Sequence, residues 1–386
     1  MKSRMPIFLL VLLLILCWGI SWKPGGDLGV YYKASEWLQK GWITRLYSEN
    51  AEIGNFFYGP FGLAVLKPLS LLSFHQANLL WLTLQTFSYL IFWSFLAKFF
   101  PEIFDPKRLS LFLLTWIVSI KPIHASFQSH NVQLMFAAIL IFSEWKTHSK
   151  KRRNQVLSGI LVSLIASIKI YPAFIVLYYL LRKSNFVRLG LFLGGLLSLI
   201  VPILVFGFET GFSLPKQFVQ NALHYHHVYD LSKDVVSLSL PSLLTTWLPL
   251  SWISAGWVSL IVGLVAVLYF SWTFKTRHLI SPQLERYSWA LSWGAMAMLN
   301  STTRPDYFIF FVPAFTAIPL TLKKNFRPAL YRVGLFVSLA LIAFITEWTL
   351  GSRELTHQLE SLRIPVIGIL LLCFMQFSTL HTMLKE

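Results

Sequence analysis

Asp27 is the residue of this sequence with the clearest potential for acid–base chemistry. It follows two glycines, Gly25 and Gly26, directly after the first apolar stretch. Adjacent glycines allow a tight backbone turn, so this carboxylate is expected where the apolar stretch would leave a membrane. There it could act as a general base that takes a proton from a hydroxyl group. The alternative is that Asp27 only caps the following helix, and the residue types leave both interpretations open.

Three basic residues could hold a phosphate group beside such an acid. Lys121, Lys169 and Arg304 each lie at the predicted outer end of an apolar stretch, and ammonium and guanidinium groups form charge-assisted hydrogen bonds with phosphate oxygens. For Arg304, a local ion pair with Asp306 is the alternative. The predicted substrate-binding residues are polar and aromatic side chains near these positions: Tyr31, Tyr58, His130, Asn131, Tyr171, His226 and His227.

A histidine-rich segment lies in the predicted outer loop from residue 208 to residue 250. His226 and Asp230 could share one face of a helix, a spacing that is compatible with a metal site. A solvated loop that is rich in histidine is the simpler interpretation. We therefore predict no metal and no other cofactor, and the sequence leaves open whether a divalent ion assists.

Two segments of the first predicted outer loop, residues 21–75, must position Asp27. The stretch from Leu28 to Gly41 has helical periodicity, with charged residues on one face, and is expected to lie in the membrane interface. The second segment, residues 57–72, is interrupted at Lys67-Pro68. Neither offers the ~20 apolar residues that a crossing needs, so we predict that both lie on the membrane and form the roof of a cavity.

The composition places the whole chain in a membrane. Of 386 residues, 55% are hydrophobic and 13% are charged, and the mean hydropathy is +0.61, values that ordinary soluble proteins do not reach. We predict an all-α, polytopic transmembrane protein that forms a single domain over residues 1–386. About twelve spans are expected, near residues 5–22, 76–97, 109–121, 131–145, 155–168, 171–182, 189–207, 252–274, 287–299, 306–322, 333–350 and 366–383. The two cysteines lie in apolar stretches and imply no disulfide framework.

The net charge of +17 follows the topology of the chain. Basic runs such as Lys150-Lys151-Arg152-Arg153 and Lys323-Lys324 fall in alternate loops, as the positive-inside rule requires. The N-terminus is therefore predicted to be cytoplasmic, and Asp27 to face the opposite side. This distribution favours a membrane protein with lipid contacts over a nucleic-acid partner.

Small residues in the seventh predicted span indicate close helix packing. Gly190, Gly194 and Gly195 have the spacing at which membrane helices approach each other closely. We assign these glycines no chemistry.

Several motifs resemble glycosyltransferase family 87, a group of integral membrane enzymes with the GT-C fold. The similar stretches are Gly26-Asp27-Leu28-Gly29-Val30-Tyr31-Tyr32-Lys33-Ala34, Gly41, Leu46-Tyr47, Phe57-Tyr58-Gly59-Pro60-Phe61 and Lys67-Pro68-Leu69. Further along the chain, Ser129-His130-Asn131 resembles a Gly-Gln-Asn turn of the family, and Lys169-Ile170-Tyr171-Pro172 is similar to its Lys-x-Tyr-Pro motif. The resemblance covers most of residues 20–320.

The resemblance implies a reaction and roles for particular residues. Enzymes of this kind use a polyprenyl-phosphate sugar as donor and a lipid or glycan as acceptor, with an aspartate of the first outer loop as base, a role that falls on Asp27. The expected activity is an inverting transfer of a hexose, with mannose as the first candidate, at the outer face of the cytoplasmic (inner) membrane. Two departures concern the donor contacts: His130 replaces the usual Gln, and Arg304-Pro305-Asp306-Tyr307 replaces the usual tenth-span pattern.

Two other functions compete with the transferase. A flippase or transporter of lipid-linked sugars should show internal repeats and broken helices near the membrane midplane, and the sequence has no convincing symmetry between its halves. A scaffold subunit without activity would leave Asp27 replaceable. The clustering of polar residues on one predicted side favours the transferase.

Overall fold

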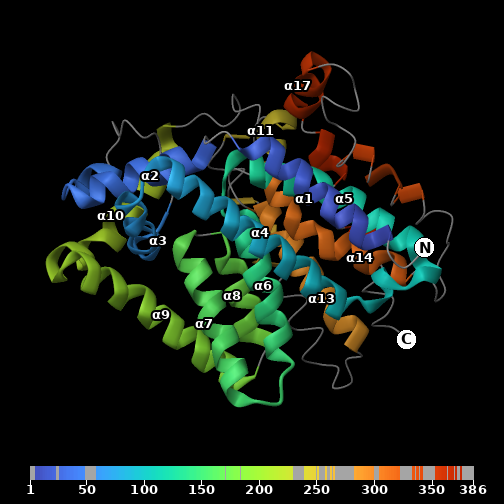
Figure 1. Ribbon diagram of the computed structural model, residues 1–386, viewed down its shortest axis with the longest axis horizontal. Coiled ribbons are helices and arrows are strands. Elements are labelled where there is room, and N and C mark those ends of the chain that lie inside the picture. Colours follow the sequence, from blue (N-terminus) through green and yellow to red (C-terminus); the bar gives the residue numbers. More distant parts are fainter. Residues whose placement is uncertain are drawn as a thin grey trace. The chain divides into compact units, whose positions relative to one another are not determined.

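The structure is a computed structural model, which describes residues 5–22, 26–47, 58–169, 171–182, 184–228, 239–248, 282–299, 304–321 and 353–362, with shorter stretches between 250 and 375. Every regular element in these ranges is a helix (Figure 1). This confirms the predicted all-α class for the described part of the chain.

The described part of the chain contains both long α-helices and short α- and 3-10 helices. The α-helices are α1 (Met5–Ser21), α2 (Gly26–Gln39), α3 (Pro60–Leu66), α4 (Phe74–Phe99), α5 (Leu109–Ser129), α6 (Gln133–Thr147), α7 (Arg152–Ile168), α8 (Ala173–Arg182), α9 (Asn185–Phe206), α10 (Phe208–Val228), α11 (Leu240–Trp247), α13 (Pro282–Leu299), α14 (Val312–Thr321) and α17 (Arg353–Ser361). The 3-10 helices are η1 (Ile43–Tyr47), η2 (Lys67–Leu71), η3 (Pro101–Phe104), η4 (Pro106–Arg108) and η5 (Pro305–Phe311).

The chain forms two compact units. Unit 1 comprises residues 1–11, 96–124 and 230–386, and unit 2 comprises residues 12–95 and 125–229. Aromatic side chains fill the interior of unit 1, where the rings of Phe99 and Trp289 stack with centroids 5.1 Å apart. Unit 2 contains α2, α3 and α6 to α10, and therefore holds most of the candidate site.

Three of the described helices are long and apolar enough to cross a membrane, namely α4, α5 and α9. Two shorter apolar segments, residues 5–19 and 60–71, accompany them. These helices support the membrane-protein character of the chain. The number of twelve spans stays a prediction, since most of the predicted spans 252–274, 333–350 and 366–383 lie outside the described residues.

The predicted end of the third span is wrong. The third span was expected to end at Lys121 and to be followed by a turn, but α5 continues through Pro122 to Ser129. A proline removes one hydrogen bond of a helix without necessarily ending it, and neighbouring helices in a membrane protein can accommodate the change. The turn is therefore short, and Lys121 lies within the helix, roughly 12 Å along its axis from Ser129 at 1.5 Å per residue.

In unit 2, the helices α7 and α9 pack against each other closely enough to require glycine (Figure 1). A Cβ atom on Gly190 would lie 2.1 Å from the carbonyl oxygen of Val156, and one on Gly194 would lie 2.7 Å from that of Ile160. At Gly195 the nearest atom would be 3.7 Å away. The prediction of close packing is confirmed for Gly190 and Gly194, whereas Gly195 lies beside the contact.

The two segments of the first loop pack against each other, also within unit 2. The helix expected at residues 28–41 is α2, and the segment expected at 57–72 consists of α3 followed by η2, with the break at Lys67. The helix α2 contacts both, and the Tyr32 hydroxyl donates to the Leu72 carbonyl at 2.8 Å.

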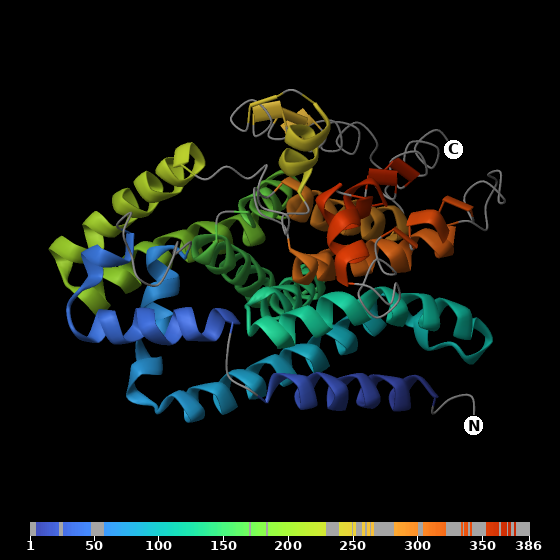
Figure 2. The ribbon, with the colours of Figure 1, turned by 90° about the horizontal axis from the view of Figure 1, so that it is seen from above.

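The first helix of the chain packs beside α4. Figure 2 shows α1 beside α4, and the Trp18 indole donates to Thr86 at 2.7 Å there.

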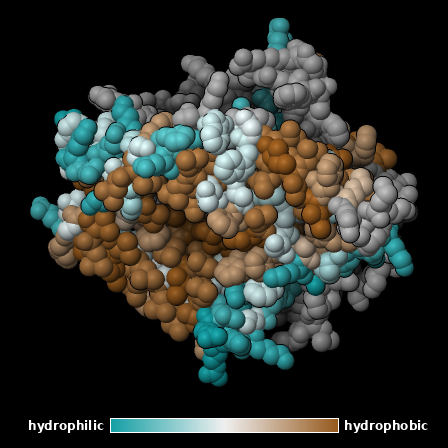
Figure 3. Space-filling view, viewed as in Figure 1, coloured by the Kyte–Doolittle hydropathy of each residue, from teal (hydrophilic) through white to brown (hydrophobic). Residues whose placement is uncertain are grey.

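The exposed face of α9 is apolar. Phe192, Leu199 and Leu204 are each more than half exposed, and Figure 3 shows a continuous hydrophobic surface over the face that α9 occupies in Figure 1. Apolar area of this extent on a helix of 22 residues is suited to lipid rather than to water.

Replacing Gly190 with alanine should destabilise the α7–α9 contact, because the new methyl group would overlap the Val156 carbonyl. Overpacking of this kind costs about 1–3 kcal/mol, so the thermal unfolding midpoint of the protein in detergent should fall. Gly195→Ala is the matched control, and it should leave the midpoint unchanged or raise it, since alanine has the higher helix propensity. Equal midpoints for the two variants would show that the close contact does not form.

Candidate active site

Asp27 lies in the first turn of α2. The first residue of that helix, Gly26, has a backbone conformation that favours glycine. Gly26 has φ of +56°, and a Cβ atom there would lie 2.3 Å from the Ser129 carbonyl oxygen at the end of α5. The N-terminus of a helix attracts negative charge, which suits a partly exposed carboxylate. The glycine that precedes Asp27 therefore lets the start of α2 meet the end of α5.

Tyr31 lies one helical turn after Asp27, and its hydroxyl donates to Asp27 Oδ2 at 3.2 Å. The same hydroxyl is hydrogen-bonded to the Tyr58 hydroxyl. The Tyr31 side chain is fully buried, and its ring contacts that of Trp81 with centroids 5.0 Å apart. Burial, followed by the proximity of Tyr58 and the charge of Asp27, raises the pKa of Tyr31, so this phenol stays protonated as a donor.

Tyr58 connects this pair to Lys169. The Lys169 ammonium lies 4.6 Å from the centroid of the Tyr58 ring, which is within the range of a cation–π interaction. The next residue, Gly59, donates its N–H to the Ile168 carbonyl at 2.8 Å. Asp27, Tyr31, Tyr58 and Lys169 thus form one connected group, which we call the acid–lysine cluster.

His130 and Asn131 form the short turn between α5 and α6. His130 is fully buried with φ of +53°, and its Nδ1 lies 3.3 Å from the Gln128 carbonyl. Burial lowers the pKa of His130, although two backbone carbonyls and the charge of Asp27 act in the opposite direction. The imidazole is therefore neutral at pH 7, next to the acid–lysine cluster.

Tyr171 is joined to this turn through Gln133. The Asn131 side-chain oxygen accepts from the Gln133 N–H at 2.9 Å, and the Gln133 side chain accepts a hydrogen bond from the Tyr171 hydroxyl. From α4, Gln85 donates to the carbonyls of Ser126 and Asn131 at 2.7 and 3.2 Å. The turn is thereby bonded directly by the Gln85 side chain and the Gln133 backbone, and Tyr171 is joined to it through the Gln133 side chain.

Several buried polar atoms around the turn have no hydrogen-bond partner among the described residues. They are Ser21 Oγ, Asn78 Oδ1, Trp81 Nε1, Gln85 Oε1, Ser126 Oγ, His130 Nε2 and Gln133 Nε2. All belong to unit 2, and none carries a formal charge. Buried polar atoms are normally hydrogen-bonded, so this neutral polar group is suited to a ligand that offers several hydroxyl groups.

The remaining predicted site residues belong to unit 1 or have side chains outside the described residues. Lys121 belongs to unit 1, where its ammonium forms an ion pair with Glu360 of α17 at 3.5 Å. Arg304 is also in unit 1, exposed and directly before η5. His226 and His227 belong to α10, where the structure describes their backbone but not their side chains. Among the predicted phosphate ligands, Lys169 shares unit 2 with Asp27 and is connected to it through Tyr31 and Tyr58.

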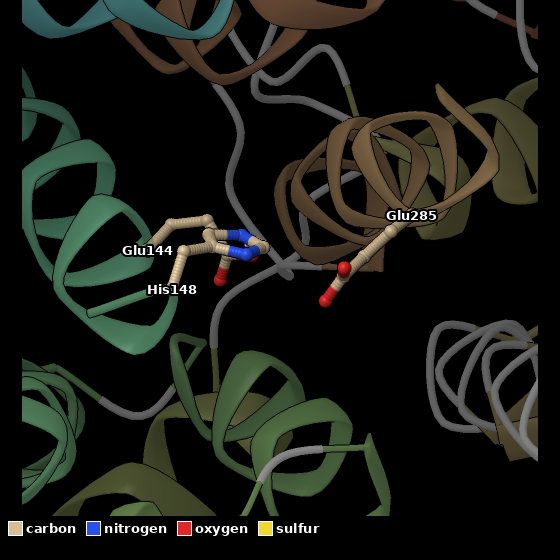
Figure 4. Close-up of side chains that lie close together, drawn as sticks. All are labelled: Glu144, His148 and Glu285. Carbon is tan, nitrogen blue, oxygen red and sulfur yellow. Dashed lines mark hydrogen bonds and ion pairs between the residues drawn. The ribbon is translucent and has the colours of Figure 1, made fainter. Parts of the chain in front are cut away.

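A glutamate–histidine pair lies at the opposite end of α6 from Gln133. Glu144 is buried, and its Oε1 lies 3.3 Å from His148 Nε2 (Figure 4). Glu285, which Figure 4 also draws, belongs to unit 1. Glu144 is 11 residues from Gln133, or about 16 Å along the helix, so this pair is separate from the acid–lysine cluster.

The sequence analysis assigned no site role to four residues of this region: Tyr47, which it named only within a family-like motif, Trp81, Gln85 and Gln133. Tyr47 donates to the Tyr58 carbonyl at 2.7 Å. Gln133 could have been found from its place two residues after Asn131, at the start of the fourth predicted span. Trp81 and Gln85 lie inside an apolar helix, and no local pattern distinguishes them from core residues.

These features define a class: a helical membrane protein with an acid and a cation gathered beside neutral polar side chains. The chain matches the family model for glycosyltransferase family 87 over residues 56–302, more than half of its length. It therefore belongs to that family, which confirms the resemblance and indicates a glycosyltransferase that acts on a sugar donor and an acceptor. Asp27 precedes the matched region. No curated protein and no solved structure matches the chain.

Gly26→Ala and Gly29→Ala should change stability in opposite directions, although both lie in α2. At position 26, alanine would meet the Ser129 carbonyl and adopt a left-handed conformation, which alone costs about 1–2 kcal/mol. At position 29 no atom lies within 4 Å, so alanine should stabilise the helix by up to ~1 kcal/mol. Thermal unfolding in detergent measures both changes. A tolerated Gly26→Ala would contradict the contact between α2 and α5.

Proposed function

We propose that the protein transfers a hexose, with mannose as the first candidate, from a polyprenyl-phosphate sugar to a lipid or glycan acceptor. The observation that carries this proposal is the acid–lysine cluster, in which Tyr31 and Tyr58 connect the Asp27 carboxylate to the Lys169 ammonium. The family match supports glycosyl transfer. The assignment of Asp27 rests on the geometry, because that residue precedes the matched region.

The proposed step is a single displacement at the anomeric carbon of the sugar. The acceptor hydroxyl gives its proton to Asp27 as its oxygen forms a bond to that carbon, and the bond from the carbon to the donor phosphate oxygen breaks. The electron pair leaves with the phosphate, whose added negative charge Lys169 stabilises. One displacement from the opposite face inverts the configuration. Asp27 therefore assists the bond that forms to the anomeric carbon, and Lys169 assists the bond that breaks to the phosphate.

The neutral polar group supports a site for sugar hydroxyls. His130 belongs to it and Asn131 is the next residue of the same turn, and the amide, hydroxyl and indole groups of the neutral polar group suit a ligand without charge. We propose Lys121, Arg304, His226 and His227 as further contacts to the donor, which would require the segments that carry them to reach the same side of the membrane. Of these four, Lys121 is already paired with Glu360.

The proposed location is the cytoplasmic (inner) membrane, with a cytoplasmic N-terminus and the active site on the opposite face. The apolar helices α4, α5 and α9 support membrane insertion. The basic run from residue 150 to residue 153, just before and within the first turn of α7, supports the orientation by the positive-inside rule. Lys169 lies at the other end of α7, and so on the proposed outer side.

Asp27→Asn should abolish transfer while the protein still folds, because the amide keeps the shape of the side chain but cannot accept a proton. A positioned base contributes about 10²- to 10⁴-fold, so the rate of sugar transfer should fall at least 100-fold. The measurement follows radiolabelled polyprenyl-phosphate mannose into lipid and glycan fractions of membranes. Wild-type activity in this variant would exclude Asp27 as the base, and movement of labelled donor across vesicles without transfer would indicate a flippase.

Lys169→Gln should slow transfer and weaken donor binding, since the variant loses the cation that faces the leaving phosphate. A charge-assisted hydrogen bond contributes about 1.5–3 kcal/mol, which corresponds to a loss of about 10- to 100-fold in kcat/KM. The control is Lys151→Gln, an exposed lysine before the opposite end of α7. If both variants have the same kcat/KM as the wild type, Lys169 does not contact the donor.

A further inference from the structure

The hydrogen bonds around Tyr31 determine which hydroxyl group is the donor in each bond. An ionised carboxylate can only accept hydrogen bonds, so Tyr31 gives its single hydroxyl proton to Asp27 Oδ2. Tyr31 then has no proton left for its bond with Tyr58. Tyr58 must be the donor in that bond. The chain of donors therefore runs from Tyr58 through Tyr31 to the carboxylate.

Tyr58 is held firmly at its backbone. Its carbonyl accepts from the buried Tyr47 hydroxyl at 2.7 Å. The adjacent Gly59 has no room for a Cβ atom, which would lie 2.1 Å from the Ser167 carbonyl oxygen. The ring of Tyr58 is thereby fixed against the end of α7, where Lys169 follows. One face of the ring receives the Lys169 ammonium, while the hydroxyl is directed to Tyr31.

We propose that Tyr31 and Tyr58 are positioning residues that set the acid Asp27 and the cation Lys169 relative to each other, and that neither tyrosine binds substrate. The proposal rests on the proposed function, because it assigns to Asp27 and Lys169 the roles of base and phosphate ligand. It replaces the substrate-binding role that the sequence predicted for both tyrosines. Their burial supports this change, as Tyr31 is 0% and Tyr58 is 6% exposed.

The arrangement also distinguishes the two oxygens of Asp27. Oδ2 accepts from Tyr31, whereas Oδ1 has no hydrogen bond to any residue in the part of the chain that the structure describes. A carboxylate held by one oxygen keeps the other in a defined direction for the proton of an acceptor hydroxyl. Hydrogen bonds in series also polarise one another, so the Tyr58 hydroxyl strengthens the donation from Tyr31.

Kinetics of four variants separate positioning from substrate binding. Tyr31→Phe and Tyr58→Phe each break the chain of donors. Tyr31→Phe removes a hydrogen bond to a charged group, which contributes about 1.5–3 kcal/mol, so kcat should fall about 10- to 100-fold. Tyr58→Phe removes a hydrogen bond between two neutral hydroxyls, which contributes about 0.5–1.5 kcal/mol, so kcat should fall about 2- to 10-fold. In both variants KM for polyprenyl-phosphate mannose should stay within about twofold of the wild type. Tyr58→Leu also removes the ring beneath Lys169, so KM should rise about two- to fivefold in addition.

The matched control is Tyr32→Phe. It lies on the same helix, next to Tyr31, and loses one hydrogen bond to the Leu72 carbonyl without touching the acid–lysine cluster. Its kcat and KM should equal those of the wild type. If Tyr31→Phe raises KM and leaves kcat unchanged, Tyr31 binds substrate and the proposal is wrong.

A second measurement does not depend on activity. Thermal unfolding midpoints are compared for Tyr31→Phe, Tyr58→Phe and the double variant. Because the two hydroxyls share one bond, the shift of the double variant should be smaller than the sum of the two single shifts. If the shifts in unfolding midpoint are additive, the hydrogen bond between the two tyrosines does not form. This result would not depend on the substrate of the enzyme.

The two measurements distinguish the proposals from each other. If Asp27→Asn is inactive while both phenylalanine variants keep the wild-type kcat, the positioning role fails and the proposed function stands. If Asp27→Asn is active, the proposed function fails. The positioning role then fails too, even if the unfolding midpoints confirm the hydrogen bond between the two tyrosines.

Discussion

Two close contacts between backbones place the functional groups of unit 2. The start of α2 meets the end of α5 at Gly26, and the segment before α3 meets the end of α7 at Gly59. Contacts between backbones leave less freedom than contacts between long side chains, because no rotamer change can relieve them. Asp27 follows the first contact and Tyr58 precedes the second, so these contacts place the two backbones, and the hydrogen bonds of Tyr31 then orient the side chains of Asp27 and Tyr58.

The polar interior beside these contacts lowers the stability of unit 2. Each buried polar atom without a partner costs roughly 1–3 kcal/mol, and Trp81, Gln85 and Gln133 each carry one such atom among the described residues. The tight packing of α7 against α9 offsets part of this cost. An apolar interior of the same volume would be more stable, so the retention of neutral donors and acceptors next to Asp27 is better explained by ligand binding than by folding.

The sequence predicted those parts of the site that depend on local spacing. The helical periodicity after Asp27 predicted the helix that the structure shows as α2, and the break at Lys67-Pro68 separates α3 from η2 as expected. The hydrogen bond between Tyr31 and Asp27, which are four residues apart on one helix face, was not predicted. The extent of α5 was missed, because Lys121-Pro122 was interpreted as the end of a helix. The ion pair of Lys121 joins residues 239 positions apart, and no local pattern reports such a partner. The contacts of Tyr58 with Lys169 and Tyr47 were not predictable for the same reason.

Two lysines of the family-like motifs in unit 2, Lys67 and Lys169, meet different environments, which separates a structural role from a chemical one. The Lys67 ammonium donates to the Val205 carbonyl at 3.2 Å and lies 5.3 Å from the centroid of the Phe206 ring. It thus neutralises the negative end of α9, as cations at helix C-termini do. A phosphate would have to displace that interaction. The Lys169 ammonium lies 4.6 Å from the centroid of the Tyr58 ring, and Tyr58 is hydrogen-bonded to the tyrosine that donates to Asp27. Lys169 therefore belongs to the acid–lysine cluster, whereas Lys67 belongs to a helix end.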